Sequence, residues 1–382
     1  MVIVYERELT HYRVPVFSRL QKRMEEEVFV VHGDEPQQSH LNTVDEGEDL
    51  VFRHKRAPTY WIGRDKMAIQ NVIPHLLKRA PDVVIVRGGI RQLHLFPLLL
   101  FYKLQGIPTI VWGQGYSRKR KFRPRHHLID RAHLSVVQLS DAYVCYNKRI
   151  KSTLSEYCPS EKLFVASNTL PVEKHLETRE ELQSIGQETI RRQLNLECPQ
   201  YLCFIGRLQP RKRVDYLLDV YQSLRSRFDV DVGLIVVGDG PERPELEAKA
   251  QKEELRDVYF VGEQYGKDAG RYLVAADAMV MPGWLGLAVN HSFAYGLPVI
   301  SQHSDDRENG VTHAPESIHV RHGETGWLAA PGNKKEMIEG IQDVLSNIEA
   351  YSERCLHYAQ ANLTMESMID GFIEAISYAR KK

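Results

Sequence analysis

The chain has 382 residues, which at ~100–200 residues per domain predicts two domains. Its 50 basic and 50 acidic residues cancel, so any binding to nucleic acid or membrane has to come from a local patch. The N-terminus becomes charged after four residues and the longest apolar run is Leu95–Tyr102. We therefore expect neither a signal peptide nor a membrane-spanning helix, which needs ~20 apolar residues.

Short β-branched runs alternate with helical segments through most of the chain. This alternation predicts an α/β protein with parallel sheets that are covered on both faces. In the first half the expected strands are Val2–Tyr5, Val28–His32, Val83–Val86, Thr109–Trp112, Ala142–Tyr146 and Leu163–Ala166. In the second half they are Tyr201–Ile205, Val232–Val237, Val258–Val261, Ala278–Met281 and Pro298–Ser301.

The alternation stops between Leu170 and Gln200, in a polar stretch bounded by two prolines. We interpret this stretch as the connection between two domains plus a leading helix, with domains at 1–170 and 171–363. A last helix at 364–382 has one apolar face. Ligands of open α/β sheets bind beyond the carboxyl ends of the strands, so a cleft between the two domains is the expected site.

Two basic features belong to the first half. His11 and Arg13 follow the first strand and are expected at the cleft, although a lone histidine is more often structural than catalytic. The loop Ser117–His127 holds six cations within eight residues and no acid. Such a loop suits nucleic acid, an anionic bilayer or a phosphorylated acceptor better than mere solvation. Its cations include Arg118, Lys119, Arg120 and Lys121.

Two strand ends of the second half carry candidate phosphate contacts. Gly206, Arg207 and Lys212 follow the strand Tyr201–Ile205, and two cations there can clamp a diphosphate. The alternative is a solvated basic loop. Gly238 and Gly240 follow the next strand, but without phosphate-loop spacing, so we interpret them as a tight turn.

The stretch "GWLGLAVNH" (283–291) predicts a glycine-bearing loop that opens a helix. Free backbone N–H groups at such a helix start suit an anion. Farther on, Ser304–Leu328 is rich in histidine but has no zinc spacing, so no metal is expected. In that segment Glu316 is the candidate for a carboxylate that faces the cleft and binds sugar hydroxyls.

Taken in order, "FIGRLQPRKRVDYLL", "VVGDGPERPELE", "AADAMVMPG", "GLAVNHSFAYGLPVIS" and "HGETGWLAAPGN" resemble glycosyltransferase family 4. The resemblance spans about Tyr201 to Asn347 and is weaker in the first half, which is similar to bacterial members that build surface polysaccharides and glycolipids. It implies a GT-B fold, in which two Rossmann-like domains enclose a cleft that holds the nucleotide-sugar. The donor mostly binds the second domain, and the last helix usually returns to the first.

The resemblance implies roles for individual residues. Arg207 and Lys212 match the cations that hold the donor diphosphate, and with them a helix N-terminus can stabilise the leaving group without a metal or cofactor. Gly286, Leu287 and Ala288 match the turn whose amides face the phosphates. Gly262, Glu263 and Gln264 match the region that contacts the base.

Three positions depart from the family pattern. The family commonly has two glutamates eight positions apart where this chain has Gly283 and His291, and a first-domain histidine where it has Gln114. The diphosphate clamp is intact, whereas the sugar-facing and ribose-facing positions are altered. We expect His291 to contact the ribose as a neutral imidazole and to lose that contact near its ordinary pKa of ~6.5.

These observations favour a retaining glycosyltransferase that moves a hexosyl group from a nucleotide-sugar to an acceptor hydroxyl. The expected acceptor is a lipid-linked or growing polysaccharide or glycolipid intermediate. The protein is expected in the cytoplasm and as a peripheral protein on the inner face of the cell membrane, with an anionic membrane surface as a partner and no nucleic acid. The alternatives are a catalytically degenerate nucleotide- or glycan-binding relative, or another GT-B enzyme such as a nucleotide-sugar epimerase.

Overall fold

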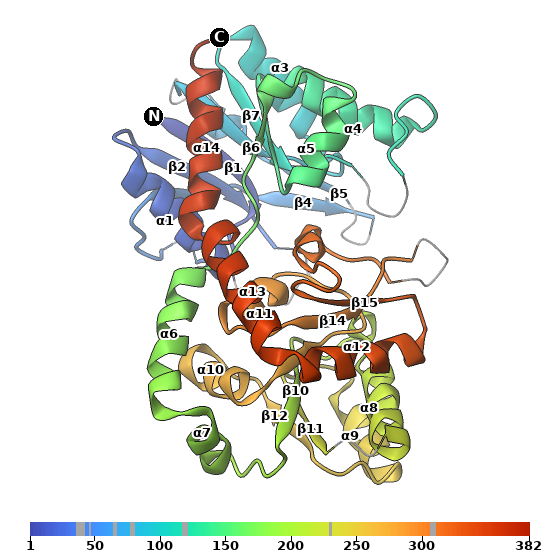
Figure 1. Cartoon of the computed structure of the whole chain (residues 1–382). Coiled ribbons are helices and arrows are strands. Elements are labelled where there is room, and N and C mark those ends of the chain that lie inside the picture. The colour runs from blue at the N-terminus through green and yellow to red at the C-terminus, as the bar shows by residue number, and fades with distance from the viewer. Residues whose placement is uncertain are drawn as a thin grey trace. The chain divides into compact units, whose positions relative to one another are not determined.

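The computed structural model of the chain describes residues 1–382 except 36–42, 46, 64–66, 77–80, 117–120, 229–230 and 306–310. It divides into two compact units (Figure 1). Unit 1 comprises Met1–Asn168 and Met365–Lys382, and unit 2 comprises Thr169–Thr364. The chain therefore passes between the units twice, and its last helix belongs to unit 1.

Unit 1 is built on a seven-stranded sheet with the order β3-β2-β1-β6-β7-β8-β9, in which all pairs are parallel. A separate antiparallel hairpin is formed by β4 and β5. The strands are β1 Val2–Glu8, β2 Val28–Gly33, β3 Arg53–Arg56, β4 Thr59–Ile62, β5 Met67–Gln70, β6 Val83–Arg87, β7 Thr109–Gly113, β8 Ala142–Cys145 and β9 Leu163–Val165. The helices are α1 Val14–Arg23, α2 Ile73–Leu76, α3 Leu95–Leu104, α4 Leu128–Leu139, α5 Lys148–Ser155 and α14 Met365–Ala379, with short 3-10 turns at His11–Arg13 and Ser160–Lys162.

The direction of the crossovers places the helices of unit 1. The connection from β1 to β2 runs one way along the sheet and those from β6 to β9 run the other way, so right-handed crossovers put α1 on one face and α3, α4 and α5 on the other. Helix α14 packs against α1 and against β7, β8 and β9 (Figure 1). There Phe372 meets the indole of Trp112 edge to face, with ring centroids 5.0 Å apart.

Unit 2 has a six-stranded parallel sheet with the order β12-β11-β10-β13-β14-β15. The strands are β10 Gln200–Ile205, β11 Val232–Val237, β12 Val258–Gly262, β13 Ala278–Val280, β14 Val299–Gln302 and β15 Gly326–Ala329. The helices are α6 Val172–Ile185, α7 Gln187–Gln193, α8 Val214–Phe228, α9 Arg243–Lys252, α10 Gly266–Ala275, α11 Ala288–Ala294, α12 Lys334–Ser346 and α13 Ile348–Asn362, with 3-10 turns at Pro210–Lys212 and Pro315–His319.

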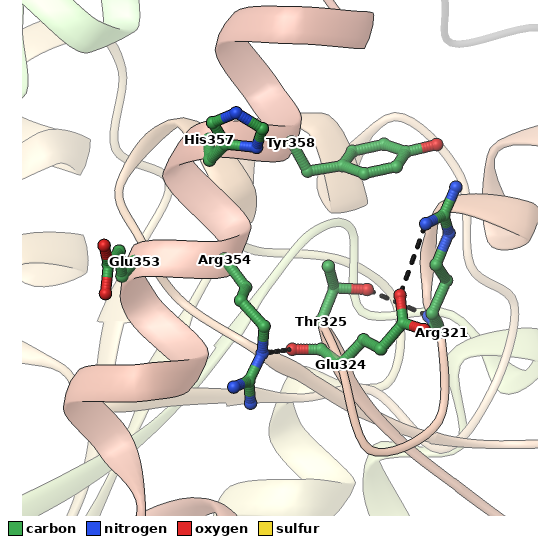
Figure 2. A pocket seen from close by; sticks show the side chains of 7 residues that line it. All are labelled: Arg321, Glu324, Thr325, Glu353, Arg354, His357 and Tyr358. Carbon is green, nitrogen blue, oxygen red and sulfur yellow. Dashed lines mark hydrogen bonds and ion pairs between the residues drawn. The ribbon is translucent and has the colours of Figure 1, made fainter.

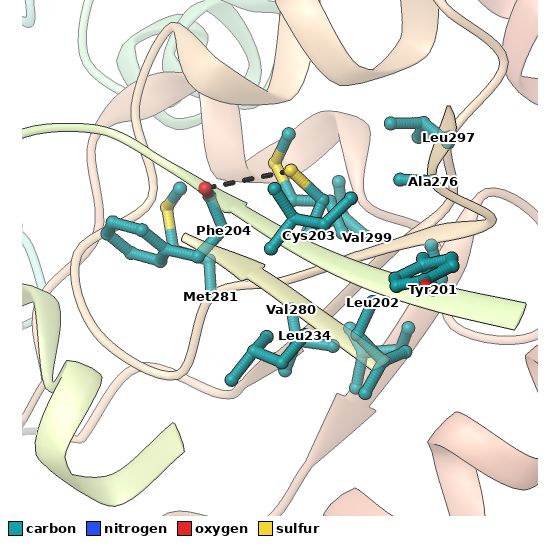
Figure 3. Packing of buried hydrophobic residues seen from close by; sticks show 14 of the residues in the cluster. Tyr201, Leu202, Cys203, Phe204, Leu234, Ala276, Val280, Met281, Leu297 and Val299 are labelled. Carbon is teal, nitrogen blue, oxygen red and sulfur yellow. Dashed lines mark hydrogen bonds between the residues drawn. The ribbon is translucent and has the colours of Figure 1, made fainter. Parts of the chain in front are cut away.

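The core of unit 2 lies on both faces of its central strands. Side chains of β10, β11, β13 and β14 interdigitate there, and Leu202, Cys203 and Phe204 have no exposed surface (Figure 3). Continuous apolar strands of this kind are typical of parallel sheets that are buried on both faces. The five cysteines are free and buried.

The eleven strands expected from the sequence are all present, and the α/β fold class is confirmed. Four further strands were not expected: the polar edge strand β3, the hairpin strands β4 and β5, and β15. Among the described residues, no helix is both long and apolar enough to cross a membrane.

Candidate functional site

The carboxyl edge of the unit 2 sheet brings several of the expected donor residues to neighbouring strand ends. Gly206 leaves β10 with a φ of +148°, a backbone conformation that suits glycine. Arg207 follows it, and its Nε atom is buried without a hydrogen-bond partner in the described structure. An unsatisfied buried guanidinium nitrogen is costly, so Arg207 is a strong candidate for contact with an anionic ligand.

Lys212 ends the 3-10 turn after β10 and crosses to the neighbouring strand end of β13. Its Nζ donates to the carbonyl of Trp284 at 2.9 Å and lies 3.7 Å from Met281 Sδ. Burial, assisted by the charge of Arg211, lowers the pKa of Lys212 to about 8. The lysine is therefore a partly desolvated cation held in place, rather than part of a freely solvated loop.

Gly283 has a structural reason to be glycine. Its amide donates to the Lys212 carbonyl at 3.1 Å, and the Trp284 amide donates to the Arg211 carbonyl at 2.8 Å. A Cβ atom at Gly283 would lie 2.3 Å from the Arg211 oxygen and 2.4 Å from the Lys212 carbonyl carbon. The two loops meet backbone to backbone, so this arrangement leaves no room for the glutamate that the family commonly has here.

The loop after β13 is also held by His313, which the sequence did not identify as important for the site. The Leu285 amide donates to His313 Nδ1 at 3.1 Å, and His313 Nε2 donates to the Gln302 carbonyl at 2.7 Å. These two bonds require a neutral imidazole with its proton on Nε2. The Ala314 amide completes the support by donating to the Leu285 carbonyl at 2.8 Å.

The helix that follows this loop, α11, is short. It has seven residues, and Gly286 and Leu287 precede it in a turn in which the Val289 amide donates to the Gly286 carbonyl at 3.0 Å. Ala288 is its first residue. The role of these three residues in binding phosphates stays a prediction.

His291 differs from its sequence-based description in one respect. Its ring packs against His175 of α6, with centroids 4.3 Å apart, and against Tyr295. Burial, followed by the neighbouring His175, lowers the pKa of His291 to about 3. The expected titration near pH 6.5 is therefore wrong for the unliganded protein. The imidazole is neutral at neutral pH, and its buried Nε2 has no hydrogen-bond partner among the described residues.

The structure also gives the contacts or the burial of the other residues that were expected to bind the donor. Gly262 ends β12 with a φ of +74°, Glu263 accepts from Tyr265 at 2.9 Å, and Gln264 Nε2 donates to the Val261 carbonyl at 2.9 Å. Glu316 is only 3% exposed, in the turn Pro315–His319. The side chain is therefore buried in unit 2, and its expected role as a cleft-facing carboxylate that binds sugar hydroxyls stays a prediction.

Gly238 and Gly240 agree with the tight-turn interpretation. A Cβ atom at Gly238 would lie 2.1 Å from the Gly206 carbonyl oxygen, and one at Gly240 would lie 2.3 Å from the Leu208 carbonyl oxygen. The glycines thus allow the turn after β11 to approach the backbone that carries Arg207.

The carboxyl edge of the unit 1 sheet is filled by a buried polar cluster, which we define as Glu6, Arg13, Arg87, Trp112 and Tyr146. Arg13 and Arg87 lie 4.5 and 4.7 Å from the centre of the Trp112 ring, and Arg87 Nε is 3.5 Å from Glu6 Oε1. Arg13 also donates to the Tyr146 hydroxyl at 3.2 Å. Burial raises the pKa of Glu6, which the two arginines partly oppose.

Arg13, which was expected at the cleft, is only 3% exposed within this cluster, and its role at a cleft stays a prediction. It donates to Asn168 Oδ1 at 2.7 Å. His11 is exposed, and its Nδ1 lies 3.8 Å from Glu48 Oε1. Gln114 is half-buried and Lys121 is exposed. Arg118, Lys119 and Arg120 lie outside the described residues.

A cavity of about 380 Å³ in unit 2 holds none of the expected site residues. It lies between α13 and the loop that precedes β15 (Figure 2). This loop is at the amino edge of the sheet. Arg321 Nη1 pairs with Glu324 at 3.2 Å, and Arg354 Nε donates to the Glu324 carbonyl at 2.7 Å. The cavity lining is Arg321, Glu324, Thr325, Glu353, Arg354, His357 and Tyr358.

Comparison with known proteins bears on the second half of the chain. Residues 199–347 match the family model for glycosyl transferases group 1. An uncharacterized glycosyltransferase of Haemophilus influenzae is 30% identical over 151 residues, which is 38% of this chain and 40% of that protein. The D-rhamnosyltransferase WbpZ of Pseudomonas aeruginosa is 32% identical over 138 residues, 35% of this chain and 32% of its own length. The matched region spans less than half the length of these relatives.

Solved structures cover the whole chain at low identity. HepE of Anabaena, in complex with UDP, has a TM-score of 0.70 at 14% identity and aligns over 98% of this chain and 99% of its own. A glycosyltransferase from Rickettsia africae has a TM-score of 0.70 at 13% identity, over 100% and 99% of the two chains. The chain thus has the GT-B fold, and its residues 199–347 match the group 1 glycosyl transferases.

Proposed function

We propose that this protein is a glycosyltransferase of family 4 type that moves a sugar from a nucleotide-sugar to an acceptor hydroxyl with retention of configuration. The observation that carries the proposal is the pair of cations after β10. Arg207 has a buried, unpartnered Nε atom and Lys212 is a desolvated ammonium. Both lie in the region that matches the group 1 model.

The proposed glycosyl transfer needs two cations of this kind at the donor diphosphate. The leaving group is a nucleoside diphosphate, so negative charge grows on its phosphate oxygens in the transition state. Preorganised cations in a site with little water stabilise that charge strongly. Arg207 can bind two oxygens at once, and Lys212 supplies a point charge, so the proposed reaction uses no metal and no cofactor.

The matched relatives support a nucleotide-sugar donor and a surface glycan or glycolipid acceptor. HepE has been solved with UDP-glucose, and a Streptococcus pneumoniae relative is an alpha-monoglucosyldiacylglycerol synthase. For this chain we propose a hexosyl donor and a lipid-linked or growing saccharide acceptor. We also propose that the protein acts in the cytoplasm at the inner membrane face and that its basic loop 117–127 contacts anionic lipid.

His291 is proposed to meet the donor ribose through its unpartnered Nε2, and Glu316 is proposed to bind sugar hydroxyls. A neutral imidazole can donate or accept one hydrogen bond with a hydroxyl. Because the pKa of His291 is about 3, this contact persists from pH 5 to 8.

A second candidate function is binding without turnover. The packing at Gly283 favours it, since the glutamate that the family commonly has near the donor sugar is replaced by a backbone contact. This candidate keeps nucleotide affinity and predicts no acceptor-dependent product.

The test is a two-step assay. A thermal-shift screen of UDP-glucose, UDP-galactose, UDP-N-acetylglucosamine and GDP-mannose finds the donor, because a ligand at ~100 times its Kd stabilises the fold by about 2.7 kcal/mol. Release of nucleoside diphosphate is then measured with and without a bacterial membrane lipid extract. The proposal expects release only with the extract. Binding without release supports the inactive relative, and release without acceptor indicates hydrolysis of the nucleotide-sugar. Conversion to an isomeric nucleotide-sugar without release indicates an epimerase.

A further inference from the structure

Unit 1 exposes an apolar sheet face at the β4–β5 hairpin. Tyr60 pairs with Ile69, and Ile62 with Met67, across the hairpin. The chain at 91–93 continues this ladder, because the Leu93 amide donates to the Ala68 carbonyl at 2.9 Å. Side chains alternate along these segments, so that one set is buried or half-buried and the other is 37–62% exposed. The exposed apolar set is Tyr60, Ile62, Met67, Ile69 and Leu93.

Helix α3 extends this surface. Within α3, Pro97, Leu100 and Leu104 are spaced by three and four residues, which places them on one side of the helix. Leu93 lies two residues before the helix and connects this side to the hairpin face. All four are exposed, and Leu100 and Leu104 reach 53% and 76%. The opposite side of α3 is equally apolar and packs into the core of unit 1. A helix that is apolar all round is normally covered on every side, so this stripe calls for an additional partner.

The segment of chain that carries the stripe is cationic. Residues 83–129 contain nine lysines and arginines and no aspartate or glutamate. Asp130, the next acid, is buried and accepts from the Arg123 amide at 2.8 Å. The exposed cations described in this stretch are Arg91, Lys103, Lys121, Arg123 and Arg125.

We propose that the sheet face of the β4–β5 hairpin and the leucine stripe of α3 form a docking surface for an anionic lipid bilayer. The apolar side chains enter the headgroup boundary, and the surrounding cations meet the lipid phosphates. A second copy of the chain fits less well, because a symmetric contact would bring the cations of this segment, such as Lys103 beside Leu104, toward their counterparts. The inference rests on the membrane partner of the proposed function and does not depend on the transfer reaction.

The test places a reporter at the surface. All native cysteines are buried, so Leu104→Cys offers a single accessible thiol for an environment-sensitive nitrobenzoxadiazole dye, with wild type as labelling background. With vesicles of 30% phosphatidylglycerol in phosphatidylcholine, we expect a blue-shifted, brighter emission that is absent with pure phosphatidylcholine. The matched control is Ile185→Cys in unit 2, whose parent side chain is 43% exposed, and its emission is expected to stay unchanged.

Co-sedimentation with the same vesicles supplies the second measurement, without any nucleotide. Leu100→Ser combined with Leu104→Ser is expected to lower the partition coefficient at least about tenfold, and raised salt to lower it further. Loss of transferase activity with vesicle binding intact would defeat the proposed function and spare this surface. The surface proposal fails if wild type does not bind, or if the label at position 104 ignores bound vesicles. It also fails if analytical ultracentrifugation shows a dimer whose contact shields the label before vesicles are added.

Discussion

The carboxyl edges of the two sheets carry cations in opposite circumstances. In unit 2, Arg207 keeps an unpartnered nitrogen, and glycines let the neighbouring loops approach the backbone beside it. In unit 1, Arg13 and Arg87 flank one tryptophan and share a buried glutamate. The same edge of the same kind of sheet thus serves two purposes. One arrangement offers charge to a ligand, and the other uses charge to fix the protein itself.

The largest expected effect lies in the unit 1 cluster. Arg87→Ala removes the cation nearest to Glu6 and leaves that carboxyl buried without its main partner. Breaking a buried charge pair costs about 3 kcal/mol at the low end of the usual range, since Glu6 can take up a proton. Urea unfolding measures this loss. A free energy of unfolding within 0.5 kcal/mol of wild type, by our rough criterion for surface changes, would show that the cluster does not stabilise unit 1.

The unit 2 cations are expected to affect catalysis and leave stability nearly unchanged. Arg207→Ala and Lys212→Ala should each lower kcat/KM about 100-fold, which corresponds to about 2.7 kcal/mol of transition-state stabilisation. Lys252→Ala is the matched control, because Lys252 is an exposed lysine in the last turn of α9. Turnover in the two cation variants that matches this control would place the diphosphate elsewhere.

The backbone contact at Gly283 is tested by adding one methyl group. Gly283→Ala should destabilise the protein by roughly 2–3 kcal/mol, because the new Cβ would meet the backbone of Arg211 and Lys212. Gly286→Ala is the control, since its Cβ would approach side chains and no backbone, with Trp284 Nε1 at 3.3 Å and Ala314 Cβ at 3.7 Å. Equal thermal unfolding of the two variants would mean that glycine at 283 has no packing role.

The smallest expected effect per residue concerns the two histidines of the pair. Burial lowers the pKa of His291 to about 3 and that of His175 to about 4. Because both values lie below the unfolded value of ~6.5, the unfolded chain binds more protons in this window. The contribution of the two neutral imidazoles to the free energy of unfolding is therefore fully present above pH 6.5. It falls as the pH drops, by about 2 kcal/mol per imidazole at pH 5.

Unfolding free energies between pH 5 and 7.5 measure that slope. His291→Phe should remove its share of the slope, and the same change at the exposed His357 should keep the wild-type curve. A wild-type protein that is equally stable at pH 5 and 7.5 would contradict the burial of the pair.

The buried strands could be predicted from the sequence, because each of them is an apolar run rich in β-branched residues. Strand β3 (Arg53–Arg56) could not be predicted in this way, because an exposed edge strand has no apolar run. The leading helix expected before β10 is divided at Gly186, where φ is +88°, into α6 and α7. The local sequence therefore predicts which residues a helix or strand buries, but it predicts less well where the chain changes direction.

At the site, the sequence identified strand-end residues and missed what surrounds them. Nothing near Gly283 in sequence tells that the backbone of Lys212 occupies the space of its missing side chain. Likewise, His291 has its lowered pKa because α6 brings His175 against it. Such contacts join segments about 70 to 116 residues apart, so only the folded structure reveals them.

The central claim is that the carboxyl edge of unit 2 binds a diphosphate through Arg207 and Lys212. The most direct measurement is calorimetric titration with UDP, UMP, GDP and GMP. For the preferred base, the account predicts that the diphosphate binds at least about tenfold more tightly than the monophosphate, as two charge-assisted contacts would provide. It also predicts that this advantage disappears in the Arg207→Ala, Lys212→Ala double variant while the variant stays folded. Equal affinities in the wild type, or an advantage that survives in the double variant, would contradict it.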